Sequence, residues 1–345
     1  MSTFIIAEAG VNHNGSEDLA LQLIDVAVEQ GADAIKFQSF KADLLVKKGT
    51  STAAYQQQQT GNNDQHAMLQ QLEMSEAMHN RIIAHCHACD IEFMSTPFDL
   101  DSADFLIERG MSRIKLPSGE LTNIPFLERL AAYDKELILS TGMADLAEVK
   151  AAVSAIDNVR NRSGFIQPLE DILTVLHCTS NYPASLGDVN LRAMQTMAKE
   201  LGLPVGYSDH TDGILVAVAA VAMGAVVIEK HFTLDKTLAG PDHKASLESD
   251  ELGMMIQQIR QIETCMGDGM KEARPSELAV RDVVRRSIVL ACDKQVGDLL
   301  SDEDLVLLRP GTGIAPGEIR NVIGRRIKVD KAAGSLLQWG DLLDA

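Results

Sequence analysis

The feature that most constrains the fold is a repeated rhythm of short apolar runs, each ending in polar residues or glycine and followed by a stretch with helical periodicity. The apolar runs are rich in β-branched residues, which favour strands. Strands that alternate with helices predict a parallel sheet covered by helices. The expected strands are FIIAEAG (4–10), AIKFQ (34–38), IEFMSTP (91–97), RIKLPSG (113–119), LILSTG (137–142), ILTVLHCTS (172–180), PVGYSDH (204–210) and VVIEKHF (226–232).

The number and spacing of these units are typical of a (β/α)8 TIM barrel within an α/β chain. An open doubly wound sheet is the second candidate for the fold. The stretch ESDELGMMIQQIRQIETCMGDG (248–269) has the spacing of a closing helix, and toward its end the rhythm stops. We therefore expect a catalytic barrel at 1–266, a linker at 267–283 and a small, mostly β domain at 284–345.

Composition excludes several classes of partner. The formal net charge of -18 argues against a nucleic-acid surface or an anionic membrane. No apolar run is long enough to span a bilayer, and the amino terminus lacks a basic region before its short apolar run. Five scattered cysteines fit reduced thiols, so we expect a cytoplasmic protein. Cys86 and Cys89 form a C-x-x-C, but no second half of a zinc site accompanies them.

Two successive strands each end in a polar cluster that contains a histidine. The first ends in Ser208, Asp209 and His210, and the second in Glu229, Lys230 and His231. Parallel strands place their carboxyl ends at one edge, where two imidazoles side by side could hold a divalent metal. The alternative is that each histidine caps its strand and bonds to the backbone.

Two lysines, Lys36 and Lys115, interrupt otherwise apolar strands. A buried ammonium group is costly unless an anion meets it, so these lysines predict a cradle for phosphate or carboxylate. A structural ion pair with Glu8 or Glu120 is the alternative. Residues 41–70 are polar and weakly periodic, and we expect a lid or substrate loop there, although the glutamine run would also suit a solvated loop.

Ten motifs carry a resemblance that covers nearly the whole chain. They are, in order, AEAGVNHNG, KFQSFKA, STPFD, KLPSGE, LSTGM, HCTSNYP, GYSDHT, EKHFTLD, GPDH and RPGTG. With these motifs the chain resembles the bacterial sialic acid (nonulosonic acid) synthase family. The resemblance implies a transferase that condenses phosphoenolpyruvate with an acylated amino sugar. It also implies a barrel followed by an antifreeze-protein-like (SAF) domain, and a homodimer in which that domain covers the partner's barrel.

The resemblance also implies roles for individual residues. Glu8 and Asp242 match the family's catalytic carboxylates, and His210 and His231 match its metal ligands, with Mn²⁺ the usual ion and Mg²⁺ or Co²⁺ possible. The sugar contacts match Tyr182 and Arg309, with Arg309 acting across the dimer. Some relatives have asparagine at the position of Ser180. The positions that match substrate contacts are Lys36, Thr96, Lys115, Ser118, Ser140, Ser180, Tyr182, Ser208 and Arg309.

Several functions remain open at the level of sequence. We rank N-acetylneuraminate synthase first, with N-acetylmannosamine as acceptor. The alternative is N,N'-diacetyllegionaminate synthase, which would use 2,4-diacetamido-2,4,6-trideoxymannose. Outside the family, a metal-dependent barrel hydrolase or a non-catalytic saccharide-binding protein would be the competing functions.

Overall fold

The structure is a computed structural model that describes residues 2–343, apart from the side chains of residues 54, 55 and 58. The chain divides into two compact units, Met1–Gly267 and Asp268–Ala345. No helix in the described part of the chain is long and apolar enough to cross a membrane.

The first unit is built on eight parallel strands. Each strand from β1 to β8 coincides with one of the runs expected from the sequence, with its ends shifted by a few residues at most. They are β1 Phe4–Gly10, β2 Ala34–Ser39, β3 Glu92–Pro97, β4 Arg113–Leu116, β5 Glu136–Ser140, β6 Leu173–Cys178, β7 Val205–Asp209 and β8 Val227–His231.

The order of the strands is that of a barrel. It runs β3-β2-β1-β8-β7-β6-β5-β4, so the last strand pairs with the first. The outer strands β3 and β4 are also neighbours in space. A doubly wound sheet would instead reverse its strand order at a switch point. The TIM-barrel prediction is confirmed, and the doubly wound alternative is wrong.

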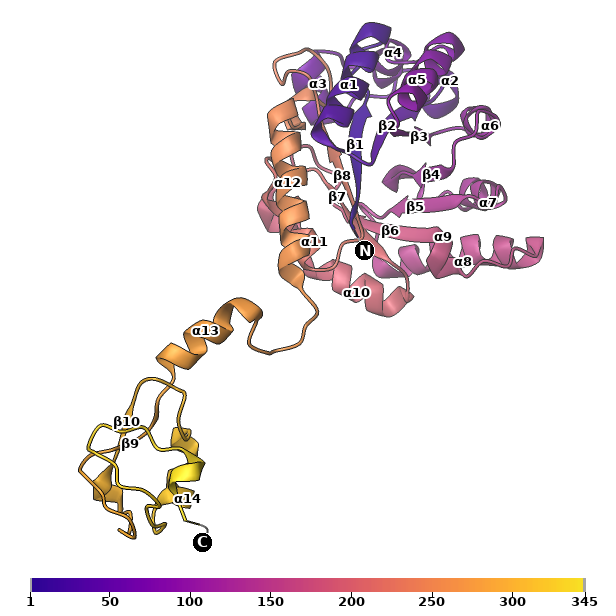
Figure 1. Ribbon diagram of the computed structural model, residues 1–345. Helices are drawn as coiled ribbons and strands as arrows, with labels where there is room; N and C mark the ends of the chain where they lie inside the picture. Colours follow the sequence, from indigo (N-terminus) through magenta and orange to yellow (C-terminus); the bar gives the residue numbers. More distant parts are fainter. Residues whose placement is uncertain (1, 344–345) are drawn as a thin grey trace. The chain divides into compact units, whose positions relative to one another are not determined.

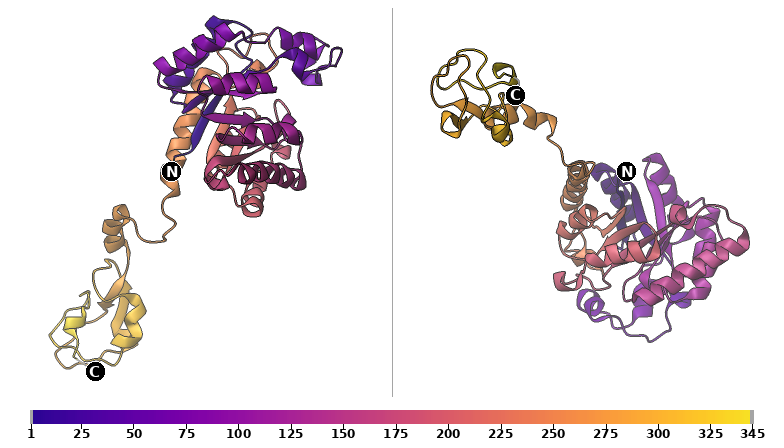
Figure 2. Two further views of the ribbon diagram at one scale, coloured as in Figure 1. Left: turned by 90° about the vertical axis from the view of Figure 1, so that its right-hand side faces the viewer. Right: turned by 90° about the horizontal axis from the view of Figure 1, so that it is seen from below.

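Helices lie outside the strands of this unit (Figure 1, Figure 2). Local sequence sets their ends: Ser16 caps α1 by accepting a hydrogen bond from the backbone of Leu19, and Gly31 ends it in the left-handed region. The outer helices are α1 Glu17–Gln30, α5 Glu76–Ala88, α6 Leu100–Glu108, α7 Ile124–Ala131, α8 Leu146–Ser163, α9 Leu169–Ile172, α10 Arg192–Leu201, α11 Leu215–Ala222 and α12 Ser249–Met266.

A small apolar layer fills the inside of the barrel. It consists of Ile6, Ala34, Met94, Ile138, Leu176 and Val227, contributed by six different strands. Because side chains alternate across a strand, the residue two positions further along also points inward. In these six strands that residue is Glu8, Lys36, Thr96, Ser140, Cys178 or Glu229. The barrel is therefore apolar at its floor and polar directly above it.

Two segments contain helices that the sequence did not predict. The expected lid at 41–70 holds α2 Ala42–Leu45, α3 Ala54–Thr60 and α4 Gln65–Gln70. The linker at 267–283 contains most of α13, Pro275–Val284. Capping compensates for weak periodicity in both: Asp64 accepts from the backbone of Ala67, and Pro275 opens α13 at a position where no backbone donor is needed.

The second unit has its own small core. Strands β9 Ser287–Leu290 and β10 Leu305–Leu308 pair antiparallel, isolated bridges join further turns, and α14 Ile319–Val322 adds one helical turn. Ile288, Leu290, Val322, Ile327 and Leu337 are among its buried residues.

His13, in the turn after β1, should make the fold sensitive to acid. Its ring is fully buried, and burial, with a smaller contribution from His79, lowers the pKa of His13 to about 4. A lowered pKa means that the unfolded chain binds the proton first, so stability falls as the pH drops from about 6.5 to about 4. The pKa shift corresponds to about 3 kcal/mol over that window.

Urea unfolding at pH 7 and pH 4.5 measures this effect. His13→Asn should reduce the acid-induced loss of stability relative to the unsubstituted protein. Equal losses in the two proteins would contradict the assignment to His13. His79, whose pKa is also lowered chiefly by burial, acts in the same direction and is present in both proteins.

Candidate active site

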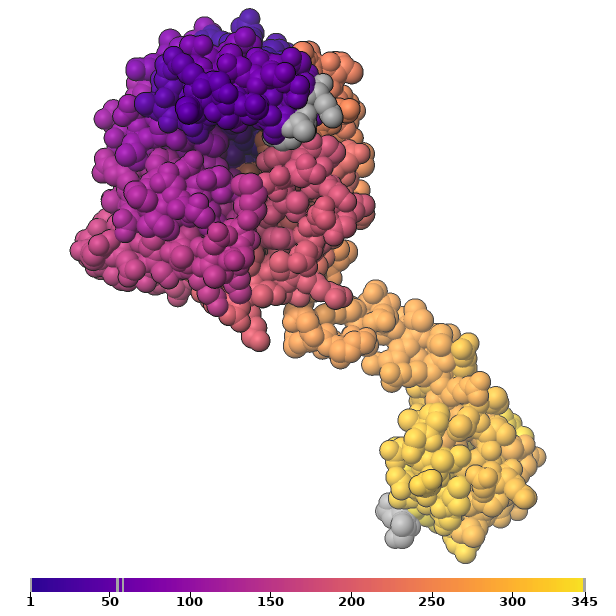
Figure 3. Space-filling view, turned by 180° about the vertical axis from the view of Figure 1, so that it is seen from behind, coloured from indigo at the N-terminus to yellow at the C-terminus, as the bar shows by residue number. Residues whose placement is uncertain are grey.

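The polar inward residues meet at the carboxyl ends of the strands, which we call the mouth of the barrel. Barrel enzymes carry their active sites at this end. The space-filling view shows a hollow between the indigo-to-violet segment and the rose-to-red segment (Figure 3). Lys36, Lys115, Glu8 and Glu229 are all at least 96% buried as whole residues, so they form an enclosed charged cluster.

Two lysines and two glutamates alternate in this cluster. Lys36 Nζ lies 2.6 Å from Glu8 Oε2 and 3.6 Å from Glu229 Oε2, and Lys115 Nζ lies 3.0 Å from Glu229 Oε1. Lys36 also donates to Thr96 Oγ1 (2.9 Å), and Ser208 donates to Glu229 Oε1 (2.9 Å). The alternative of an ion pair with Glu8 is thus realised, whereas Glu120 bonds to Asn123 instead.

The two glutamates differ in their electrostatics. Burial raises the pKa of Glu8 to about 7; Lys36 opposes this shift and the neighbouring charge of Glu229 adds to it. Burial would also raise the pKa of Glu229, but Lys115 and Lys36 together hold it well below its usual range. Glu229 is therefore the stable anion between the lysines, and Glu8 is the carboxyl that can take up a proton near neutral pH.

The two predicted metal ligands lie next to each other, with their ring centroids 5.7 Å apart. His210 Nδ1 donates to the backbone oxygen of Thr179 (2.7 Å), so Nε2 carries a lone pair and faces Tyr182 Oη (3.1 Å) and Ser208 Oγ (3.3 Å). This backbone bond fits the capping alternative, but it is also the arrangement that orients a histidine ligand.

His231 supplies the second imidazole. Its Nδ1 is buried without a hydrogen-bond partner among the described residues and lies 3.8 Å from Asp242 Oδ2. Burial lowers the pKa of both histidines, to about 4 for His210 and well below the ordinary value for His231. Neutral rings with available lone pairs are the form that binds metal, so these residues fit a divalent ion. Burial raises the pKa of Asp242 to about 6.

Two of the predicted serines, Ser118 and Ser180, lie next to one glycine, Gly142. A side chain at Gly142 would come within 2.1 Å of Ser180 Oγ and 2.9 Å of Ser118 Oγ, so any larger residue there would displace these hydroxyls. Ser118 Oγ accepts from the Gly142 backbone (2.9 Å), and Ser140 Oγ is buried without a partner in the described part of the chain. The structure thus brings the hydroxyls of Ser118 and Ser180 together.

Arg309 belongs to the second unit, where it is exposed in the RPGTG turn, and its contribution to the mouth stays a prediction. Another group of ligand-type side chains lies outside the barrel rather than at the strand ends: Asp25 on α1, His85 on α5, and Cys89 directly after α5. Cys86 is buried in the core, so the C-x-x-C does not act as a unit.

Sequence reasoning missed two inward residues. Glu229 appeared only as a neighbour of His231, yet it joins both lysines and Ser208. Gln38 donates to Glu8 Oε1 (3.2 Å). The signal that could have found them is strand parity, because each lies two residues from a predicted site residue on the same strand face.

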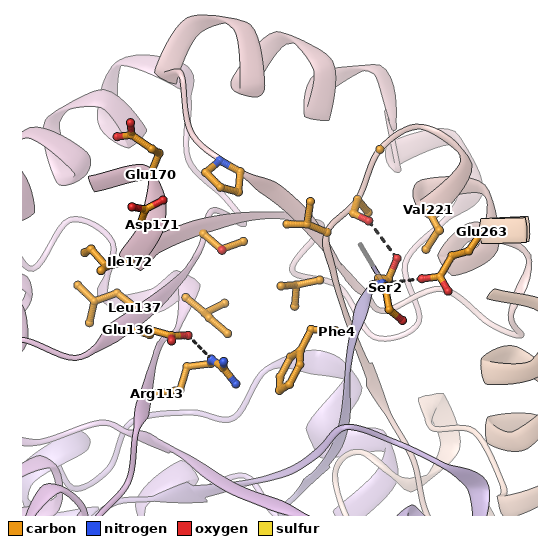
Figure 4. Close-up of a pocket in the computed structure, with 18 of the residues that line it drawn as sticks. Ser2, Phe4, Arg113, Glu136, Leu137, Glu170, Asp171, Ile172, Val221 and Glu263 are labelled. Carbon is orange, nitrogen blue, oxygen red and sulfur yellow. Dashed lines mark hydrogen bonds and ion pairs between the residues drawn. The ribbon is translucent and has the colours of Figure 1, made fainter. Parts of the chain in front are cut away.

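A cavity of about 930 Å³ lies at the opposite, amino end of the strands. Arg113 pairs with Glu136 at its edge (2.7 Å), beside the apolar side chains of Phe4, Leu137 and Ile172 (Figure 4). That end of a barrel serves stability rather than catalysis, so this cavity is not the candidate active site.

Comparison with known proteins decides the family. The sequence profile of the NeuB family matches residues 23–271, and that of the SAF domain matches residues 285–343. A relative from Legionella pneumophila, named N,N'-diacetyllegionaminic acid synthase, is 53% identical over 340 residues, which is 98% of this chain and 94% of the relative. The chain belongs to the NeuB family.

Two further relatives support membership of the NeuB family. The N,N'-diacetyllegionaminic acid synthase of Campylobacter jejuni is 48% identical and covers 94% of this chain and 95% of its own length. The crystal structure of an N-acetylneuraminic acid synthetase from Leptospira borgpetersenii, 34% identical, aligns with a TM-score of 0.69 over 81% of this chain and 90% of its own. The predicted enzyme class, a phosphoenolpyruvate-dependent nonulosonic acid synthase and hence a transferase, is confirmed. The ranking of N-acetylneuraminate synthesis above diacetyllegionaminate synthesis is not confirmed, because the two relatives compared by sequence are both named for the second activity.

Proposed function

We propose that the protein is an N,N'-diacetyllegionaminate synthase, which condenses phosphoenolpyruvate with 2,4-diacetamido-2,4,6-trideoxymannose. The observation that carries the choice of acceptor is the sequence identity of 53% and 48% to two relatives of that name, against 34% to the sialic acid synthetase. N-acetylneuraminate synthesis, ranked first from sequence, becomes the second candidate.

The charged cluster supports the binding of phosphoenolpyruvate. This substrate carries a phosphate and a carboxylate, and Lys36 and Lys115 are buried cations at the mouth. Glu229 holds both ammonium groups in place through contacts of 3.6 and 3.0 Å. Thr96, Ser118, Ser140, Ser180 and Ser208 would supply hydroxyl donors around the two anionic groups.

The reaction that we propose forms one carbon-carbon bond and breaks one carbon-oxygen bond. Carbon 3 of phosphoenolpyruvate bonds to the aldehyde carbon of the open-chain sugar, whose oxygen takes up a proton. Water adds to carbon 2, and the bond from carbon 2 to the phosphate oxygen then breaks, which leaves a keto group and inorganic phosphate. Glu8 and Asp242 lie at the mouth, where they would position the water and move protons.

His210 and His231 would hold a divalent metal, with Mn²⁺ proposed and Mg²⁺ or Co²⁺ as alternatives. When bound, such an ion supplies Lewis-acid polarisation of a carbonyl oxygen. Thr179 fixes the tautomer of His210 through its backbone oxygen, and Asp242 faces Nδ1 of His231. Tyr182 packs against the His210 ring, 4.2 Å between centroids, and would orient the sugar beside it.

Phosphate release from phosphoenolpyruvate tests the proposal. The purified protein with Mn²⁺ should release phosphate with the 2,4-diacetamido sugar, release much less with N-acetylmannosamine, and release none after chelation. Preference for N-acetylmannosamine would restore the first-ranked sequence prediction. Turnover without phosphoenolpyruvate would contradict the proposed reaction and favour a barrel hydrolase.

We also propose a homodimer in which Arg309 acts on the partner's barrel. Specific activity should then fall as the protein is diluted below the dimer dissociation constant, because monomers lack the guanidinium at the mouth. Light scattering and activity measured over the same dilution series test this. Monomers that keep full activity would exclude a role in trans.

A further inference from the structure

A second, smaller cavity adjoins the mouth on the side of the lid. It has a volume of about 260 Å³ and is lined by Gln59 on α3, Tyr182 and Pro183 after β6, and Lys236 and Leu238 after β8. Tyr182 borders both this cavity and the histidine pair, since its hydroxyl lies 3.1 Å from His210 Nε2. A sugar whose reacting carbon lies at the histidines would therefore extend its more distant carbons into this cavity.

The lid places one unsatisfied acceptor there. Gln59 Oε1 is buried and has no hydrogen-bond partner among the described residues. A buried amide oxygen without a partner is costly, so its presence calls for an explanation, and a donor on a bound ligand would be one. Its neighbours in the glutamine run differ: Gln56 Oε1 accepts from the Ala53 backbone (3.1 Å), and Gln57 is exposed. The run is therefore not uniformly a solvated loop.

We infer that Gln59 recognises the acetamido group at carbon 4 of the acceptor. An acetamido group offers an N–H to the Gln59 oxygen and a C=O to its NH₂, so the two amides are complementary in either orientation of the Gln59 side chain. Leu238 and Pro183 provide apolar surface for the acetyl methyl group. This inference rests on the proposed function, because only the diacetamido acceptor carries nitrogen at carbon 4.

Two lysines line the cavity, and one of them, Lys244, is exposed and has no ion pair among the described residues. Lys236 already pairs with Glu251 (2.5 Å), and the backbone of Lys236 donates to Glu248 (3.1 Å). In the other orientation of its side chain, Gln59 would present its NH₂ group, which can donate to a phosphate oxygen. A sugar phosphate is therefore the competing occupant that the experiment must exclude.

Three acceptors separate the contribution of the carbon-4 group. They are 2,4-diacetamido-2,4,6-trideoxymannose, its analogue with a hydroxyl at carbon 4, and N-acetylmannosamine 6-phosphate. The full-length protein is assayed by phosphate release with saturating phosphoenolpyruvate and Mn²⁺. For Gln59→Leu, the ratio of kcat/KM for the diacetamido sugar to kcat/KM for the 4-hydroxyl analogue should fall by about tenfold or more.

The matched control is Gln57→Leu, which changes an exposed glutamine two residues away and should leave that ratio unaltered. Gln59→Met gives a second, flexible apolar replacement in case the leucine disturbs α3, and thermal unfolding verifies both folds. An unchanged ratio in both Gln59 variants would overturn the inference, as would a fall confined to the phosphorylated sugar. If instead the unsubstituted protein releases no phosphate with the diacetamido sugar, the proposed function fails, whatever the variants do.

Discussion

Replacing His231 by alanine should abolish metal-dependent turnover, a loss of at least about a thousandfold, while the protein stays folded. His231 Nδ1 is buried without a hydrogen-bond partner in the described part of the chain, so its removal breaks no bond that holds the barrel. The ring faces His210 and Asp242 rather than the core between strands and helices. Removing the ring should therefore reduce metal affinity and turnover while the protein stays folded.

Two measurements separate these effects. Titration with Mn²⁺, followed by electron paramagnetic resonance, should show weaker binding in His231→Ala, and thermal unfolding should show a cooperative transition. The matched control is His177→Gln, because His177 bonds to the backbone oxygen of Val189 (2.7 Å) and is not part of the cluster at the mouth. Full activity in His231→Ala would refute the metal role, and equal losses in both variants would point to a general effect on the fold.

The rhythm of the sequence was sufficient to predict the barrel. Apolar runs and helical stretches are local patterns, so β1 to β8 could be placed within a few residues from the order of residues along the chain. The same rule predicts the mouth, because strand ends converge whatever their separation along the chain. Lys36 and Lys115, 79 positions apart by their residue numbers, therefore bind one carboxylate.

The residues of the charged cluster could not all be predicted, because this depends on which face of its strand each side chain occupies. Glu229 and Lys230 are adjacent in the sequence, yet Glu229 points into the barrel and Lys230 outward. Without the register of β7 and β8, the two charges look equivalent. The helices within residues 41–70 and α13 were missed for a different reason: they are short and held by caps, so apolar periodicity gave no signal.

Replacing Lys230 by methionine should destabilise the fold by about 3–5 kcal/mol, because it leaves a buried carboxylate without its countercharge. Lys230 Nζ lies 2.9 Å from Asp209 Oδ2 and donates to the backbone oxygen of Thr211 (2.5 Å), and both charged side chains are fully buried. Burial lowers the pKa of Lys230, an effect that Asp209 only partly opposes. Urea unfolding of the variant measures the loss.

Two further variants test the cause. Asp209→Asn combined with Lys230→Met removes both charges and keeps an oxygen for the Thr211 backbone, so it should recover more than half of the lost stability. Lys150→Met is the control, because the Lys150–Glu200 pair (2.6 Å) is exposed and its loss should cost less than about 1 kcal/mol. A loss of that small size in Lys230→Met would contradict the prediction.

The position of this ion pair links stability to the site. Asp209 and Lys230 are register partners on β7 and β8, and each immediately precedes a histidine of the proposed metal pair. The pair therefore locks the two strand ends at the level where His210 and His231 must stay 5.7 Å apart between centroids. Residues that orient ligands typically change metal affinity by about 10–100-fold when replaced. Lys230→Met should accordingly weaken Mn²⁺ binding even under conditions where the variant remains folded, and Lys150→Met should not.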